Sequence, residues 1–158
     1  MRDTQSNLSN TYNKMGRREE ASQMDRDIYY GCVRLFGEEH YKTLGQAINY
    51  ASSLETLERF KEAKSLLRRT VPVARRVLGE RDDITLRMRS VYAYSLYADP
   101  NATLDDLHEA VKMLEDIEPI TRRVLGGAHP LTVQIEEHLR ESRAALGSAK
   151  PPDAIAAS

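Results

Sequence analysis

The stretch RRVLGERDDIT at residues 75–85 is written almost unchanged a second time, as RRVLGGAHPLT at residues 122–132. A fainter copy, VRLFGEEHYKT, occupies residues 33–43. The glycines of the three copies are Gly37, Gly79 and Gly126, which are 42 and 47 residues apart. Self-similarity at a period of roughly 20 to 50 residues is typical of solenoids and other repeat arrays. The sequence therefore predicts a chain built from repeated units.

Each repeated stretch contains the signals that end one helix and begin the next. A glycine suits a left-handed cap at the end of a helix because it has no Cβ to clash. Three residues after the glycines stand His40, Asp82 and His129, where N-capping or local packing explains the residue type. Pro130 follows His129 and suits a first helical position, where its missing N–H costs nothing. We interpret the repeated stretches as helix boundaries and not as a catalytic motif.

The segments between these boundaries have helical periodicity. In residues 43–57, apolar or small side chains recur in steps of three and four at Leu44, Ala47, Ile48, Ala51 and Leu54. A second helix follows up to residue 78, and the same two-helix pattern recurs up to residue 125, with Pro100 and Asn101 in the loop between its helices. Residues 7–21 align without gaps on residues 49–63, and one more helix follows residue 129. We therefore expect about seven helices, namely three antiparallel pairs and one closing helix.

These boundaries predict one repeat domain over residues 1–147, with units at about 2–37, 40–79 and 82–126 and a capping helix at 130–146. Residues 148–158 are small, contain prolines and lack periodic apolar positions, which predicts a disordered tail. Pro72 and Pro119 occupy equivalent points inside second helices, where proline removes a backbone hydrogen bond and is expected to bend the helix.

The second unit resembles the tetratricopeptide repeat in its longer, kinesin-light-chain-like form, through Asn49, Ala51, Leu54, Phe60, Ala63 and the following RRVLG. That form reads approximately N-L-A-x-L-x-x-x-G-x-Y-x-x-A and ends in L-G-x-x-H-P-x-T. The turn glycine of the motif matches Gly16 and corresponds to Leu57 in the second unit. The resemblance covers residues 2 to about 147 and implies an all-α, right-handed superhelical solenoid of antiparallel helix pairs.

Composition excludes several classes of function. With 23 basic and 24 acidic residues, the net charge of −1 provides no global field for nucleic acid or an anionic membrane. No stretch approaches the roughly 18 consecutive apolar residues of a membrane span, so no membrane insertion is expected. The single cysteine, Cys32, fits a reducing compartment and lies beside Ile28 and Leu35 on an apolar face, as a buried structural thiol would. The sequence thus predicts a soluble cytoplasmic protein.

No set of residues predicts catalysis or a bound cofactor. The four histidines are scattered over different repeats, which argues against a metal site, and no glycine-rich phosphate loop is present. His108 and His138 are isolated on charged helices, where exposure to solvent or to the groove is expected. The sequence therefore predicts a protein that is not an enzyme.

The resemblance implies that the first helix of each pair lines a concave groove, where asparagine can hold an extended peptide by its backbone. The groove candidates are Asn7, Asn10, Asn49, Ser52, Arg87, Tyr94 and His138. Arg87 would favour a ligand with an acidic residue or a free C-terminus near the third repeat. Tyr94 and Tyr97 share one helix face, either as packing between helices or as an aromatic shelf for a peptide.

The resulting hypothesis is a non-catalytic protein–protein interaction module, a scaffold or adaptor that binds a peptide or protein segment in its groove. The alternative is a fragment or subunit of a larger assembly, such as the repeat array of a signalling ATPase, with a structural or regulatory role. The identity of the ligand and the oligomeric state are left open.

Overall fold

The computed structural model describes residues 7–8 and 16–149, and all regular structure in this part of the chain is helical. Six helices follow one another: α2 (Arg18–Phe36), α3 (Tyr41–Thr56), α4 (Phe60–Leu78), α5 (Asp83–Ala98), α6 (Leu104–Leu125) and α7 (Pro130–Ser148). Residues 7–8 are also helical, but most of the first expected helix, including Asn10, lies outside the described residues. None of the described helices is long and apolar enough to cross a bilayer.

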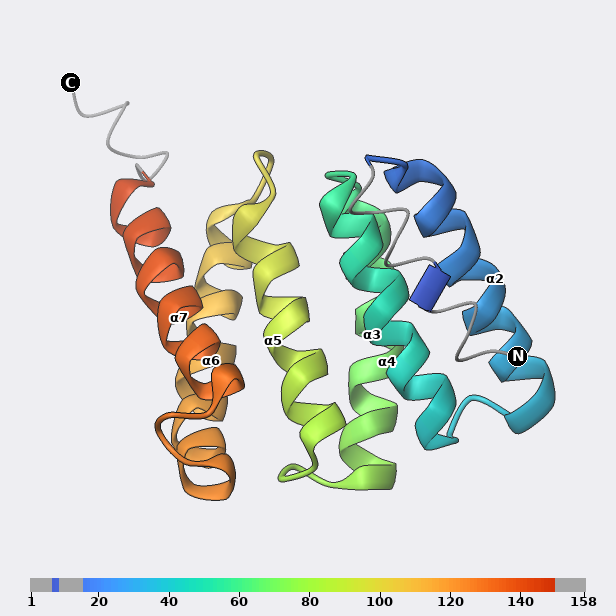
Figure 1. Cartoon of the computed structure of the whole chain (residues 1–158). Helices are drawn as coiled ribbons and strands as arrows, with labels where there is room; N and C mark the ends of the chain where they lie inside the picture. Colours follow the sequence, from blue (N-terminus) through green and yellow to red (C-terminus); the bar gives the residue numbers. More distant parts are fainter. Residues whose placement is uncertain (1–6, 9–15, 150–158) are drawn as a thin grey trace.

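The helices stack in chain order as antiparallel neighbours. Each one packs against the next, and α3 also contacts α5, which in turn contacts α7. Figure 1 shows α3, α5 and α7 next to one another in the nearer layer, with α4 and α6 behind them. The predicted all-α array of antiparallel helix pairs is confirmed.

The glycine junctions have a backbone conformation that favours glycine. Gly37, Gly79 and Gly126 have φ of 86°, 93° and 94° with ψ of 168°, 166° and 156°. The positive φ was expected, but ψ is extended and not left-handed helical, and this region is essentially restricted to glycine. The N–H of each glycine donates to the carbonyl four residues earlier, so the helical hydrogen-bond pattern continues up to the glycine.

The next helix begins at the predicted caps. The Nδ1 atoms of His40 and His129 accept hydrogen bonds from the backbone N–H groups of Lys42 and Leu131, each at 3.1 Å. Asp82 Oδ1 accepts from the N–H of Ile84 at 2.9 Å. A cap of this kind contributes about 1 kcal/mol to helix stability. The histidines at these positions are therefore explained by helix initiation.

The core lies between the two layers and contains side chains from both. Ala47, Ala51 and Ala93 of the first helices are fully buried, which allows the second helices to approach closely. Leu67 and Leu114 of the second helices, also fully buried, fill the space between neighbouring pairs. Burying a leucine side chain contributes about 1.5–3 kcal/mol.

A half-buried ion cluster fixes the loop between α5 and α6. Lys64 Nζ of α4 lies 2.9 Å from Asp99 Oδ2 and 3.6 Å from Asp106 Oδ2, and all three side chains are largely shielded from solvent. Asp106 also completes a reciprocal capping box with Thr103 at the start of α6. The loop therefore keeps α5 and α6 in register although it is longer than the other turns.

The structure corrects two details and extends one. The turn residue with positive φ in the second repeat is Glu58 (φ 60°), so Glu58, and not Leu57, takes the place of Gly16 (φ 78°). Cys32 and Ile28 are buried as expected, but Leu35 is 63% exposed because it lies in the last turn of α2. Val77 and Val124 are exposed at the equivalent positions of α4 and α6.

Helix α7 runs through Gly147 to Ser148, two residues beyond the expected end. Pro72 and Pro119 lie inside α4 and α6, and residues 150–158 of the predicted tail lie outside the described residues.

Candidate functional site

The exposed sides of α3, α5 and α7 form a surface that repeats with the sequence. Three rows of equivalent positions, 42 and then 47 residues apart, are at least partly exposed on all three helices, whereas neighbouring positions such as Leu44 and Leu86 are buried. We call this surface the first-helix face. Its three rows of equivalent residues are Gly45, Arg87 and Gln134; Asn49, Val91 and His138; and Ser52, Tyr94 and Glu141.

Five of the seven predicted groove residues lie on the first-helix face: Asn49 and Ser52 on α3, Arg87 and Tyr94 on α5, and His138 on α7. Asn7 is helical and exposed, and Asn10 lies outside the described residues.

Two polar residues on this face, Asn49 and Arg87, have partners within their own helices. Asn49 Nδ2 donates to Gln46 Oε1 at 3.3 Å. Arg87 Nε lies 3.0 Å from Asp83 Oδ2, in an exposed pair one helical turn apart. Such pairs contribute only a few tenths of a kcal/mol, so they can open or share their groups with a ligand.

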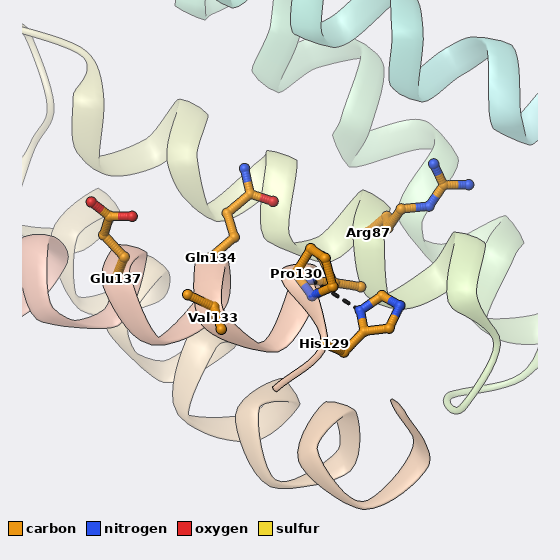
Figure 2. Close-up of a pocket in the computed structure, with 7 residues that line it drawn as sticks. Arg87, His129, Pro130, Val133, Gln134 and Glu137 are labelled. Atoms are coloured by element: carbon orange, nitrogen blue, oxygen red, sulfur yellow. Dashed lines mark hydrogen bonds between the residues drawn. The ribbon is translucent and has the colours of Figure 1, made fainter. Parts of the chain in front are cut away.

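An open pocket of about 630 Å³ lies between the first half of α7 and Arg87 of α5. It is lined by Arg87, His129, Pro130, Leu131, Val133, Gln134 and Glu137. Figure 2 shows Arg87 and Glu137 at opposite ends of this pocket, with Pro130 and Val133 between them. Val133 is 50% exposed, so an apolar group in the pocket would cover surface that water now contacts. The pocket thus combines an apolar floor with one basic and one acidic end.

Further along α5, four rings from three helices form an aromatic cluster. The ring centroid of Tyr94 lies 6.4 Å from that of Phe60, 5.4 Å from that of Tyr97 and 5.3 Å from that of His138. His138 and Tyr97 are 6.0 Å apart. Tyr94, Tyr97 and His138 are each only partly buried, so the cluster packs helices together and also presents ring surface to solvent.

Carboxylates surround this aromatic cluster. Tyr97 Oη donates a hydrogen bond to Glu141 Oε2 at 2.6 Å, and burial together with that bond raises the pKa of Tyr97. Burial raises the pKa of Tyr94, and the charges of Glu55, Glu141 and Glu58 raise it further.

His138 is held in its neutral form. Burial lowers the pKa of His138, although Glu141 and Glu137 oppose this shift. The ring Nδ1 lies 3.4 Å from Ser90 Oγ, which is a suitable partner for a neutral imidazole in either tautomer. His138 therefore acts as one more aromatic ring on this face and adds no positive charge at neutral pH.

Glu55 is a half-buried acid between α3 and α5. Burial raises its pKa to about 8, although the hydroxyl of Ser95 donates a hydrogen bond to its carboxylate and opposes the shift. Glu55 is therefore largely protonated at neutral pH, and it lies beneath the first-helix face as a polar contact between neighbouring repeats.

Sequence reasoning identified Tyr94 and His138 but missed the acidic partners. The spacing of the repeats could have identified these acids, because it makes Glu141 equivalent to Tyr94 and Glu55 equivalent to Tyr97. Phe60 had no such signal, since it begins a second helix and reaches the cluster only through the packing of α4 beneath α5.

Comparisons with known proteins agree with this architecture. The family described as Tetratricopeptide repeat matches residues 2–41 and 43–84, which are 82 of the 158 residues. No curated protein sequence matches the chain.

Two solved structures superpose on this chain with a TM-score of 0.82 at 21% identity. Both are of a candidate kinesin light chain from Podosopora anserina with nearly identical TPR-like repeats, and one of them is a point variant. BtubC (BKLC) from P. vanneervenii superposes with a TM-score of 0.58 at 15% identity. The alignments cover 92% and 95% of this chain, and 66% of each of those chains, which is just under two thirds of their length.

Proposed function

The chain belongs to the tetratricopeptide repeat family, whose repeats generally serve as protein-interaction modules, and from that premise we propose that it binds an extended peptide segment of a partner protein along the first-helix face without catalysing a reaction. The observation that carries this proposal is the repetition of exposed polar and aromatic positions on α3, α5 and α7. In a stacked array, equivalent positions recur at regular intervals across neighbouring repeats, which suits a ligand that is itself extended.

The side chains on this face support contacts to a peptide backbone. Asn49 provides both a donor and an acceptor, so it can bind a peptide amide whatever the neighbouring side chains. Its bond to Gln46 is an exposed contact within one helix that a ligand can replace at little cost. The ring surfaces of Tyr94 and His138 add area of the kind that is enriched in protein interfaces.

Arg87 supports a contact to a carboxylate of the peptide, either an acidic side chain or a free C-terminus. Its ion pair with Asp83 is exposed and uses one side of the guanidinium at 3.0 Å. Arginine carries five N–H donors, so further donors are available for a ligand at this end of the pocket.

The test begins with selection of binders from a random peptide library displayed to the immobilised full chain. The dissociation constant of a selected peptide is then measured for the wild type and for the double variant Asn49→Ala/Arg87→Ala. We expect the peptide to bind the variant at least about tenfold more weakly, because two exposed contacts of about 0.7 kcal/mol each are lost. The melting temperature should stay unchanged, since both side chains are exposed.

The matched control is Gln23→Ala/Arg76→Ala, which removes an exposed amide and an exposed arginine from the second helices α2 and α4. This variant should bind the peptide as the wild type does. Equal affinity for all three proteins would move the binding surface away from α3 and α5 and would contradict the proposal.

A further inference from the structure

We propose that the aromatic cluster of Phe60, Tyr94, Tyr97 and His138, with the carboxylates around it, is a subsite for a cationic side chain, lysine or arginine, of the bound peptide. This inference rests on the proposed function and adds the chemistry that the peptide must carry at one position.

The geometry of the rings suits a cation. Tyr94 lies at the centre of the cluster, 5.3–6.4 Å from each of the other three ring centroids. An ammonium or guanidinium group placed over the face of an aromatic ring is attracted by the negative charge density of that face. Tyr94 and Tyr97 are partly exposed, so a ligand can reach their surfaces without unfolding of a helix.

The charges around the rings have one sign. In the described part of the chain, every ionisable acid or base other than tyrosine that shifts the pKa of Tyr94, Tyr97 or His138 is a carboxyl group. Three of them are Glu58, Glu137 and Glu141, and the fourth, Glu55, is largely protonated at neutral pH and adds little charge. Glu58, Glu137 and Glu141 are exposed, and they come from the turn between α3 and α4 and from α7. Such a surface attracts a cation from several sides and repels an acidic side chain.

His138 does not counter this field. Burial lowers its pKa below the ordinary value of 6.5, so the imidazole carries little positive charge at neutral pH. A neutral imidazole adds a ring to the subsite without adding repulsion toward a cation.

Glu58 occupies a turn position where a glycine would be relaxed. Its φ of 60° is the only positive φ of a non-glycine residue in the described part of the chain, and Gly16 has φ 78° at the equivalent position of the first repeat. The strained turn holds a carboxylate beside Tyr94 that a glycine could not supply, and strain of this kind often accompanies a functional position.

The position of the subsite relative to Arg87 constrains the peptide. Tyr94 follows Arg87 by seven residues on α5, which corresponds to roughly 10 Å along a helix. An extended chain covers that distance in about three residues. A peptide that places a carboxylate at Arg87 is therefore expected to carry its lysine or arginine about three residues away.

The inference can be tested with the peptide selected for the proposed function. Each position of that peptide is replaced in turn by lysine, arginine, alanine or glutamate, and the affinities are measured by fluorescence anisotropy. We expect one position at which lysine or arginine binds the wild-type chain about threefold to tenfold better than alanine, and at which glutamate binds worst. This preference should shrink as the salt concentration rises.

Two variants assign the preference to the subsite. In Glu58→Gln/Glu141→Gln, the shape of both side chains is kept while both charges are removed, so the preference for lysine or arginine should disappear. The control Asp27→Asn/Glu115→Gln removes two exposed carboxylates from the second helices α2 and α6 and should keep the preference.

The outcomes separate this inference from the proposed function. If the peptide binds through Asn49 and Arg87 but no position prefers a cation, or if Glu58→Gln/Glu141→Gln keeps the preference, the cationic subsite is refuted and binding on the first-helix face stands. If no peptide can be selected, the proposed function fails, and the subsite fails with it. A cation preference that disappears only in Glu58→Gln/Glu141→Gln supports the subsite.

Discussion

Replacing Glu55 with glutamine should make the protein more stable at alkaline pH and leave it nearly unchanged in acid. The pKa of Glu55 is raised from 4.5 to about 8 by burial between α3 and α5. The folded protein therefore holds a proton on Glu55 over a pH interval in which the unfolded chain has released it. Because the folded state binds more protons than the unfolded state there, stability falls as the pH rises from about 4.5 to about 8.

The size of the effect follows from the difference of about 3.5 between the two pKa values. At 1.36 kcal/mol for each pKa unit, the full loss would reach roughly 5 kcal/mol above the folded pKa. Glu55 keeps some exposure to solvent, so its ionised carboxylate can turn toward water and recover part of that free energy. We expect a loss of about 2 kcal/mol for the wild type, which Glu55→Gln avoids because an amide does not ionise and can still accept the hydrogen bond from Ser95.

The assay is urea unfolding, followed by circular dichroism, across this pH interval. The unfolding free energy of Glu55→Gln minus that of the wild type should be near zero at the acidic end and should grow to about 2 kcal/mol at the alkaline end. The control is Glu115→Gln, which changes an exposed carboxylate 3.5 Å from Arg143. Parallel pH profiles for the wild type and Glu55→Gln would show that Glu55 is already ionised in the folded protein, and the burial argument would be wrong.

Four further changes test the fold. Gly79→Ala should lower the unfolding free energy by about 1–3 kcal/mol, because alanine is strained at φ 93° and ψ 166° although its Cβ would meet no atom within 4 Å. Gly45→Ala, inside α3 with equally open space, should instead raise the unfolding free energy by about 0.5–1 kcal/mol. Equal effects of the two substitutions in thermal melts would contradict the backbone argument. Leu114→Ala should cost about 2–5 kcal/mol in urea unfolding because the side chain is fully buried, and a cost below about 1 kcal/mol would mean that the core is loosely packed there. Truncation after Gly126 removes α7 from its contacts with α5 and α6 and should cause aggregation in light scattering, whereas a monomeric truncate with an unchanged melting temperature would refute a capping role for α7.

The helix boundaries could be predicted because their signals are local. A glycine with positive φ and a capping side chain three residues later depend only on neighbouring backbone atoms, so Gly79 and Asp82 identify a junction from the sequence alone. The error at Leu57 was one of register, because the alignment of residues 7–21 on 49–63 already places Glu58 opposite Gly16. Gly16 marks the turn in the first repeat, but Glu58 has the positive φ in the second, and a glutamate is not expected in that conformation.

The composition of the aromatic cluster was harder to predict because it depends on packing between repeats. Phe60, Tyr94 and His138 belong to α4, α5 and α7, and their ring distances are set by the angles at which these helices stack. Periodicity places Tyr94 on an exposed face but does not show which rings from other helices reach it. The half-burial of Glu55 has the same origin, since it lies on the edge of α3 that α5 covers.

The most direct test of binding on the first-helix face is to map the contact of a selected peptide by nuclear magnetic resonance on the full 17.9 kDa chain. Backbone amide shifts are recorded for the free chain and during titration with the peptide. We expect the largest changes to cluster at Asn49, Arg87, Tyr94 and His138, on α3, α5 and α7, and amides on the outer sides of α2, α4 and α6 to change little. Changes concentrated on α2, α4 and α6, with the first-helix face unaffected, would contradict peptide binding on that face.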